Sequence, residues 1–376
     1  MHMSMIPLRK NVGIAFDGGG IKGLVVARAL LTLEKELRCK PLITSPKIKI
    51  MAGTSTGAII ASSIAIGMQA NDIVSAYRKM GQYVFPRLSP AWFPDSVKNA
   101  DELLLAILRH SLYSNKIFIE VLRDTIEKHT KKADITLAEL NEILGPDKVL
   151  ILTVMNVTER RTRFLKSYRQ NDGDWKLWEA ILASCSVPPA LPVWSRHENG
   201  QEIYYTDGSL GNYINPAYIV AREAISFCGY SPKHVSVISF GTGWLMSKSY
   251  QNERGAPTHW RGIDWAKNVP DLYSGDAIRS QSLDVLESHD TRKIDFRRYQ
   301  FKLKKDIPAE GYADDETYAY MEKLGDEVGI NITENHFAPS PNTQYDPEEL
   351  YVLQKRYQEA RKHAKNRSIF RKLRFL

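Results

Sequence analysis

A serine between two glycines, in Gly53-Thr54-Ser55-Thr56-Gly57, is the first feature of this sequence that could do chemistry. The pattern Gly-x-Ser-x-Gly is typical of a nucleophile elbow, a sharp turn from a strand into a helix that exposes the serine hydroxyl. The turn favours glycines because side chains at those positions would strain it. We therefore predict that Ser55 is a nucleophile for acyl transfer, supported by Gly53 and Gly57. The alternative is that Ser55 only caps the helix that follows.

The glycine-rich loop Gly18-Gly19-Gly20-Ile21-Lys22-Gly23 is the second such feature. Its spacing also fits the Gly-x-Gly-x-x-Gly of dinucleotide-binding proteins, which need an acidic residue about 20 positions later. Residues 38–46 contain no Asp or Glu, which counts against that interpretation. A phosphate loop remains possible, although the chain has no Gly-x-x-x-x-Gly-Lys-Ser/Thr segment. Backbone N–H groups at a helix start equally suit an oxyanion, so we predict Gly18, Gly19 and Gly20 as its donors.

An aspartate precedes a glycine in the segment Tyr204-Tyr205-Thr206-Asp207-Gly208-Ser209. By itself, Asp-Gly is typical of a turn. A serine hydroxyl is a poor nucleophile at pH 7, however, and needs an adjacent base. Histidine is that base in a triad, and His234 and His259 follow Asp207 in the chain without lying in a recognisable motif. A triad and a simpler pair of serine and aspartate both stay open on these residues alone.

Short apolar segments that lead into glycine turns position these residues. The segment 12–16 precedes the glycine loop and a helix over 24–37, and 48–51 precedes the elbow and a helix from Ala58. Further strands are predicted over 149–157, 162–168 and 235–240, and helices over 101–110, 116–129 and 175–184. Strands that alternate with helices predict an α/β fold with a mainly parallel sheet covered on both faces.

Taken together, the motifs Asp-Gly-Gly-Gly-x-Lys-Gly, Gly-x-Ser-x-Gly and a later Asp-Gly resemble, in type and order, those of the patatin-like phospholipase family. Two more segments are similar to motifs of that family, Ala183-Ser184-Cys185-Ser186-Val187-Pro188 and Gly241-Thr242-Gly243. The resemblance covers residues 10–245. It implies a three-layer α/β fold with a mainly parallel central sheet and helices on both faces.

The resemblance also implies a catalytic dyad, in which Asp207 contacts Ser55 directly and acts as its base. A carboxylate can do so where an apolar site raises its pKa. Lys22 matches the basic position of the family's glycine loop and would steady that loop or meet a lipid phosphate, unless it is only a solvated lysine. Gly23 and Gly208 complete the supporting motif residues. The chain departs from the family at Ser209, where a glycine or alanine is usual, so substrate fit there is in question.

The activity that the resemblance implies is that of a phospholipase A, which cleaves acyl esters of membrane phospholipids. No metal and no organic cofactor is expected. Two alternatives remain: a non-enzymatic scaffold that binds lipid or nucleotide, and a serine protease or acyl-transferase built on the same elbow. The motifs distinguish neither the A1 from the A2 position nor one headgroup from another, and they indicate no oligomeric state.

The 376 residues suggest one large catalytic domain with additions. We predict a catalytic core over 10–245 with a helical insertion at about 77–146, a possible regulatory part of the same domain over 246–337, and a linker with a basic helix over 338–376. The longest apolar stretch, 58–68, is too short to span a membrane. The three cysteines lack metal-ligand spacing and suit a reducing compartment. We expect a cytoplasmic protein that lies at the inner membrane face when active.

The formal net charge of +8 lies entirely at the C-terminal end, because nine Lys and Arg but only one acid, Glu359, follow Leu350. Apolar residues recur among these cations at roughly helical spacing, which suits docking on an anionic membrane surface. A solvated helix is the alternative. RNA binding is a third option, and no nucleic-acid motif supports it.

Aromatic and cationic residues alternate over residues 244–265 and could stack on a base and pair with phosphates. Some bacterial patatin-like enzymes are effectors of antiphage defence that a cyclic nucleotide activates, and this chain resembles that subgroup. We predict Arg254, Trp260 and Arg261 as contacts of such an activator. The alternative is an ordinary loop whose aromatic residues pack on the core.

Overall fold

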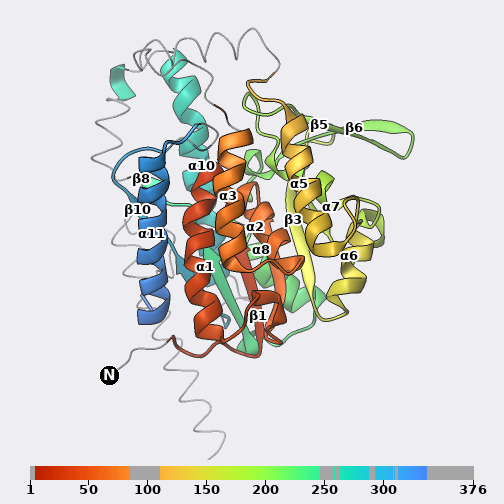
Figure 1. The fold of residues 1–376 in the computed structure, drawn as a ribbon, viewed down its shortest axis with the longest axis vertical. Helices are drawn as coiled ribbons and strands as arrows, with labels where there is room; N and C mark the ends of the chain where they lie inside the picture. The colour runs from red at the N-terminus through yellow and green to blue at the C-terminus, as the bar shows by residue number, and fades with distance from the viewer. Residues whose placement is uncertain are drawn as a thin grey trace, which may run out of the picture.

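An eight-stranded sheet organises the fold (Figure 1). The computed structural model describes residues 5–84, 86, 111–245, 257–259, 262–287, 293–307, 309 and 312–336. The strand order is β5-β6-β3-β2-β1-β7-β9, and β4 pairs with β3. The strands are β1 (Asn11–Phe16), β2 (Ile48–Thr54), β3 (Val149–Asn156), β4 (Arg161–Lys166), β5 (Trp194–Glu198), β6 (Gln201–Asp207), β7 (Val235–Phe240) and β9 (Asp295–Tyr299), and β8 (Trp244–Leu245) with β10 (Lys302–Leu303) forms a separate ribbon.

The centre of the sheet is parallel. β1 runs parallel to β2 and β7, β2 to β3, and β7 to β9, whereas β4, β5 and β6 form antiparallel pairs at one side. Side chains along β1 alternate between the two faces: Ile14 and Phe16 belong to one apolar core and Ala15 to the other. This alternation, buried on both sides, is what a covered parallel sheet requires.

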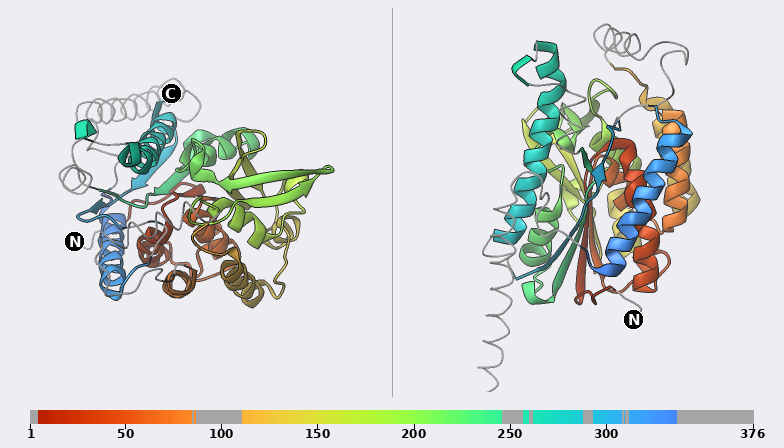
Figure 2. Two further views of the ribbon diagram at one scale, coloured as in Figure 1. Left: turned by 90° about the horizontal axis from the view of Figure 1, so that it is seen from above. Right: turned by 90° about the vertical axis from the view of Figure 1, so that its left-hand side faces the viewer.

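Helices cover both faces of the sheet. In Figure 2, the right-hand view shows the sheet edge-on between one layer that contains α1, α3 and α11 and another that contains α8 and α10. The first layer consists of α1 (Gly23–Leu37), α2 (Thr56–Ala65), α3 (Ala70–Val84), α5 (Asn115–Thr130), α6 (Leu137–Leu144), α7 (Leu177–Cys185) and α11 (Asp315–Glu334). The second consists of α8 (Ala217–Arg222) and α10 (Gly262–Glu287). The predicted α/β class with a mainly parallel, doubly covered sheet is confirmed.

The predicted elements agree with the structure up to the end of β7 and differ beyond it. The strand predicted over 235–240 is β7, and the segment 162–168 became β4, the antiparallel partner of β3. No strand or helix was predicted over 246–337, but the chain forms α10, β9 and α11 there. Pro270 and Gly275 lie inside α10. Because both residue types usually interrupt helices, the sequence pattern does not predict this helix. The helix predicted over 101–110 and the basic tail over 338–376 lie outside the described residues.

The C-terminal part of the described chain belongs to the same sheet as the core. β9 pairs with β7 from Ser236↔Asp295 to Phe240↔Tyr299, and α11 packs on α1, as Figure 1 shows. Within the described ranges, no helix is both long enough and apolar enough to cross a bilayer.

Candidate active site

Two strands meet end to end at one place on the edge of β3. β2 ends with the pair Thr54↔Thr153, and β6 ends with the pair Val154↔Asp207. Because β4 occupies the other edge of β3 over the same residues, β2 and β6 must share this edge. Ser55, which directly follows β2, and Asp207, the last residue of β6, are therefore brought together although they are far apart in the sequence.

Ser55 has the backbone of a nucleophile elbow. Its φ of 54° and ψ of −124° are rare for any residue other than glycine. A side chain at Gly57 would place its Cβ 2.1 Å from the Phe16 carbonyl oxygen, so the elbow needs a glycine at that position. The alternative that Ser55 merely caps α2 is wrong, because its side chain makes no capping hydrogen bond.

The sequence predicted an exposed serine, but Ser55 is buried, with only 6% of its surface accessible. The glycine loop causes this burial, since a Cβ on Gly18 would lie 3.3 Å from the Cβ of Ser55. The Asp207 carboxyl lies beside Ser55 as well, close enough that the Ser55 side chain lowers the pKa of Asp207.

Asp207 is buried and its carboxyl is fixed in place. The N–H of Ser209 donates to Oδ1 of Asp207 at 2.7 Å, and the N–H of Asp207 donates to the Ser186 carbonyl at 2.8 Å. Burial raises the pKa of Asp207 to about 6, although its hydrogen bonds with Ser55 and Ser209 act in the opposite direction. A carboxyl with this pKa is a better base near neutral pH than an ordinary aspartate.

The glycine loop lies against Ser55. The N–H of Gly18 donates to the Ile214 carbonyl at 3.0 Å. We predicted this N–H as an oxyanion donor, but it is already used in that hydrogen bond. The prediction is therefore corrected to Gly19 and Gly20, whose N–H groups have no acceptor among the described residues. The hydroxyl of Thr242 donates to the Gly18 carbonyl at 2.5 Å and gives the segment Gly241-Thr242-Gly243 a structural role.

A buried ion pair fixes the start of the glycine loop. Arg298, on β9, donates from Nη1 to Oδ1 of Asp17 at 2.7 Å and from Nη2 to the other oxygen, and both side chains are fully buried. Arg298 also donates to the Ser239 hydroxyl at 2.6 Å. Sequence reasoning missed Arg298, because no motif surrounds it and its partner is far away in the chain.

Tyr77 supports the elbow from α3. Its hydroxyl donates to the Thr56 carbonyl at 2.9 Å, and Thr56 directly follows Ser55. Gly23 lies against the same two side chains, since a Cβ there would be 2.3 Å from the Thr56 hydroxyl oxygen. Lys22 is half-buried in the short helix Gly20–Lys22, and its predicted role stays a prediction.

His234 lies at the wrong end of the sheet to complete a triad. It precedes β7, whose first residue, Val235, pairs with Asn11 at the start of the parallel strand β1. Ser55 lies beyond the carboxyl end of β2, at the opposite end of the sheet. His259 is exposed in the short helix Pro257–His259. Asp207 is the carboxylate that lies beside Ser55.

The predicted activator contacts Arg254, Trp260 and Arg261 lie outside the described residues. In the part of the chain that the structure describes, no group of three or more His, Cys, Asp or Glu side chains is arranged to hold a metal ion.

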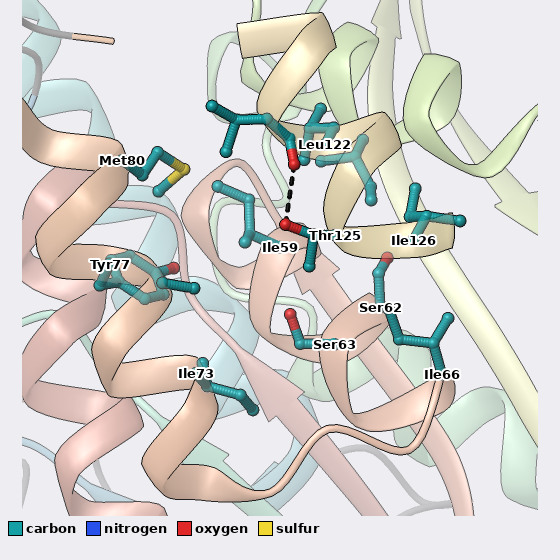
Figure 3. Close-up of a pocket in the computed structure, with 13 residues that line it drawn as sticks. Ile59, Ser62, Ser63, Ile66, Ile73, Tyr77, Met80, Leu122, Thr125 and Ile126 are labelled. Carbon is teal, nitrogen blue, oxygen red and sulfur yellow. Dashed lines mark hydrogen bonds between the residues drawn. The ribbon is translucent and has the colours of Figure 1, made fainter. Parts of the chain in front are cut away.

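An apolar pocket lies between α2, α3 and α5 (Figure 3). Figure 3 shows Met80, Tyr77 and Ile73 of α3 facing Ile59 of α2, Ile66 just after α2, and Leu122 and Ile126 of α5. The other lining residues are Ser62, Ser63, Ala76, Val121, Thr125 and Ile181. Tyr77 thus contacts both the pocket and the elbow, and Ile59 lies about one helical turn after Ser55.

The fold and the site define a class: a three-layer α/β protein whose elbow serine lies beside a buried aspartate. The model of the patatin-like phospholipase family matches residues 14–220, more than half of the chain. The chain therefore belongs to the patatin-like phospholipase family.

Two relatives illustrate how far the similarity extends. A cGAMP-activated phospholipase of Vibrio cholerae is 25% identical over 243 residues, which cover 61% of this chain and 63% of that protein. Patatin-2-Kuras 3 of Solanum tuberosum is 23% identical over 283 residues, covering 67% of this chain and 65% of that protein. The chain thus spans slightly less than two thirds of each relative. The crystal structure of VipD from Legionella pneumophila aligns with a TM-score of 0.44 at 13% identity, over 94% of this chain and 75% of VipD.

Proposed function

We propose that this protein is a lipid acyl hydrolase of the phospholipase A type, in which Ser55 is the nucleophile and Asp207 its base. The observation that carries the proposal is the strained elbow serine beside the buried Asp207 carboxyl, whose pKa the Ser55 side chain lowers. Membership of the patatin-like phospholipase family supports the same reaction class.

In the proposed reaction, Asp207 accepts the proton of the Ser55 hydroxyl while the oxygen attacks the ester carbonyl carbon. The N–H groups of Gly19 and Gly20 stabilise the resulting oxyanion. Collapse of the intermediate breaks the ester bond, and the lysophospholipid leaves with the proton held by Asp207. Asp207 then takes a proton from water while the water oxygen attacks the acyl-serine. Asp207 returns this proton to the Ser55 oxygen as the acyl–serine bond breaks and the fatty acid leaves. Neither a metal nor an organic cofactor takes part.

The apolar pocket supports a substrate with acyl chains. Most of its lining side chains are apolar, and it lies beside α2, whose N-cap residue is Ser55. A protease or an acyl-transferase would use the same elbow, but the apolar surroundings favour a lipid. The cations that follow Leu350 would hold the protein on an anionic membrane surface at the inner face of the membrane.

We further propose that a cyclic nucleotide activates the enzyme, as the name of the Vibrio cholerae relative, a cGAMP-activated phospholipase, indicates for that protein. Arg254, Trp260 and Arg261 offer the stacking and phosphate pairing that a nucleotide needs. A role in antiphage defence follows from this proposal. The competing function is a scaffold that binds lipid or nucleotide without turnover, and the paired Ser55 and Asp207 favour the enzyme.

Incubation with phospholipid vesicles tests the proposal directly. We expect vesicles of phosphatidylethanolamine and phosphatidylglycerol, with a different acyl chain at each position, to yield lysolipid and fatty acid. Release should be strong only with cGAMP or another cyclic di- or trinucleotide. Mass spectrometry of the products identifies the acyl position.

The Ser55→Ala variant under identical conditions is the control. Equal release of fatty acid with and without each nucleotide would show that the protein is a constitutive lipase, which needs no activator. Nucleotide binding without any release by the wild-type protein would favour the scaffold.

The pH dependence of turnover follows from the raised pKa of Asp207. The base works only when ionised, so kcat/KM on a neutral short-chain ester should be level above about pH 7 and should fall below pH 6, by about tenfold per pH unit. An ordinary aspartate, with a pKa of 3.8, would keep the enzyme active down to about pH 4. A stopped-flow or chromogenic assay between pH 4 and 8 measures the midpoint. A midpoint near 4 would contradict a buried base.

A further inference from the structure

The hydroxyl of Ser184 lies between the nucleophile and the strand that carries the site. Ser184 is in the last turn of α7 and is fully buried. Its Oγ accepts the backbone N–H of Ser55 at 3.0 Å and donates to the Thr153 carbonyl at 2.7 Å. The motif around Ser184 is one that the sequence singled out without giving it a role.

The conformation of Ser55 explains why this acceptor matters. Ser55 is neither inside β2 nor inside α2, so its N–H has no partner within a strand or a helix. A buried N–H without an acceptor is unfavourable, and Ser55 already carries an unfavourable φ of 54°. Among the described residues, Ser184 provides the one acceptor for this N–H. The hydroxyl therefore stabilises the backbone that holds the nucleophile.

The second partner of Ser184 links the nucleophile to the base. Thr153 pairs with Thr54, the residue before Ser55, and the next residue of β3, Val154, pairs with Asp207. The peptide of Gly208, which follows Asp207, packs so closely that a Cβ there would lie 2.5 Å from the Thr153 carbonyl oxygen. The Thr153 carbonyl thus contacts the Asp-Gly turn on one side and Ser184 on the other.

We infer that Ser184 is a positioning residue, which acts through the Ser55 backbone and sets the position of the Ser55 hydroxyl relative to Asp207. This inference rests on the proposed function, because it assumes that the Ser55 and Asp207 pair does the chemistry. A dyad has a single proton-transfer contact, so a small displacement of the Ser55 backbone affects the rate directly. A displacement of about 1 Å can cost about 100-fold in rate.

The test compares Ser184→Ala with Ser167→Ala in the full chain. Ser167 is a matched control, because it is also buried and its hydroxyl accepts a β3 backbone N–H, that of Leu150, and donates to the Asn141 side chain. Leu150 lies at the other end of β3, away from Ser55. The measurements are kcat and KM on a soluble short-chain ester, the rate at which a fluorophosphonate labels Ser55, and Tm.

We expect Ser184→Ala to lower kcat and the labelling rate about 100-fold, with less than a threefold change in KM. Ser167→Ala should keep both kcat and the labelling rate within threefold of the wild-type values. Ser184→Cys, whose thiol is a weaker acceptor, should give an intermediate kcat. If the Ser184→Ala protein does not fold, Ser184→Cys takes its place in the test. Wild-type kcat in the variant that is tested would overturn the inference, and so would an equal loss in Ser167→Ala. Activity in Ser55→Ala would instead refute the proposed function.

Discussion

Ser55→Ala is expected to abolish ester hydrolysis, with kcat/KM at least about 10⁴-fold below the wild-type value. The reason is that Ser55 carries the elbow hydroxyl beside the Asp207 carboxyl, so without it neither the acyl-enzyme nor its precursor can form. The fold should persist. Alanine has about the same backbone preferences as serine at φ 54°, and the change removes only the side-chain hydroxyl.

The measurement is hydrolysis of a soluble short-chain ester, alongside thermal unfolding and fluorophosphonate labelling. Ser75→Ala, at an exposed serine on α3, serves as the control and should retain wild-type kcat/KM. Labelling of the Ser55→Ala protein, or more than about 1% of the wild-type turnover, would show that another residue is the nucleophile.

Asp207→Asn is expected to reduce kcat about 10³- to 10⁴-fold while the protein stays folded. Asparagine has the same size and keeps an oxygen that can accept the Ser209 N–H, which is 2.7 Å from Oδ1 in the wild-type structure. It cannot accept the proton of the Ser55 hydroxyl. His234 lies at the opposite end of the sheet and cannot replace Asp207. The fall in activity near pH 6 should also disappear in this variant, because the group that titrates has been removed.

The control is Asp326→Asn, which disrupts an exposed ion pair with Arg28 and should leave kcat within about twofold. The assay records the full pH profile of both variants on the same soluble ester. An active Asp207→Asn protein combined with an inactive His259→Ala protein would show that the site is a triad.

The local sequence determined the elements that carry the motifs. β1, β2 and β7 are short apolar runs that end at glycine turns, and their residues alone predicted them, because strand formation and tight turns depend on neighbouring residues. The elbow at Ser55 was predictable for the same reason. The pairing of Ser55 with Asp207 came from a resemblance in motif order, since nothing in either segment encodes its contact with the other.

Tertiary structure alone decided how these segments meet. The end-to-end arrangement of β2 and β6 on one edge of β3 depends on strand order and register, which link residues far apart in the chain. The contacts of Arg298 with Asp17 and of Ser184 with Ser55 depend on the same pairings, so no local pattern indicated them. The pKa of Asp207, the engagement of the Gly18 N–H and the burial of Ser55 arise from packing around the site. The sequence thus determined which residues could react, and the assembled sheet decided which of them touch, because burial and long-range hydrogen bonds exist only once the chain is folded.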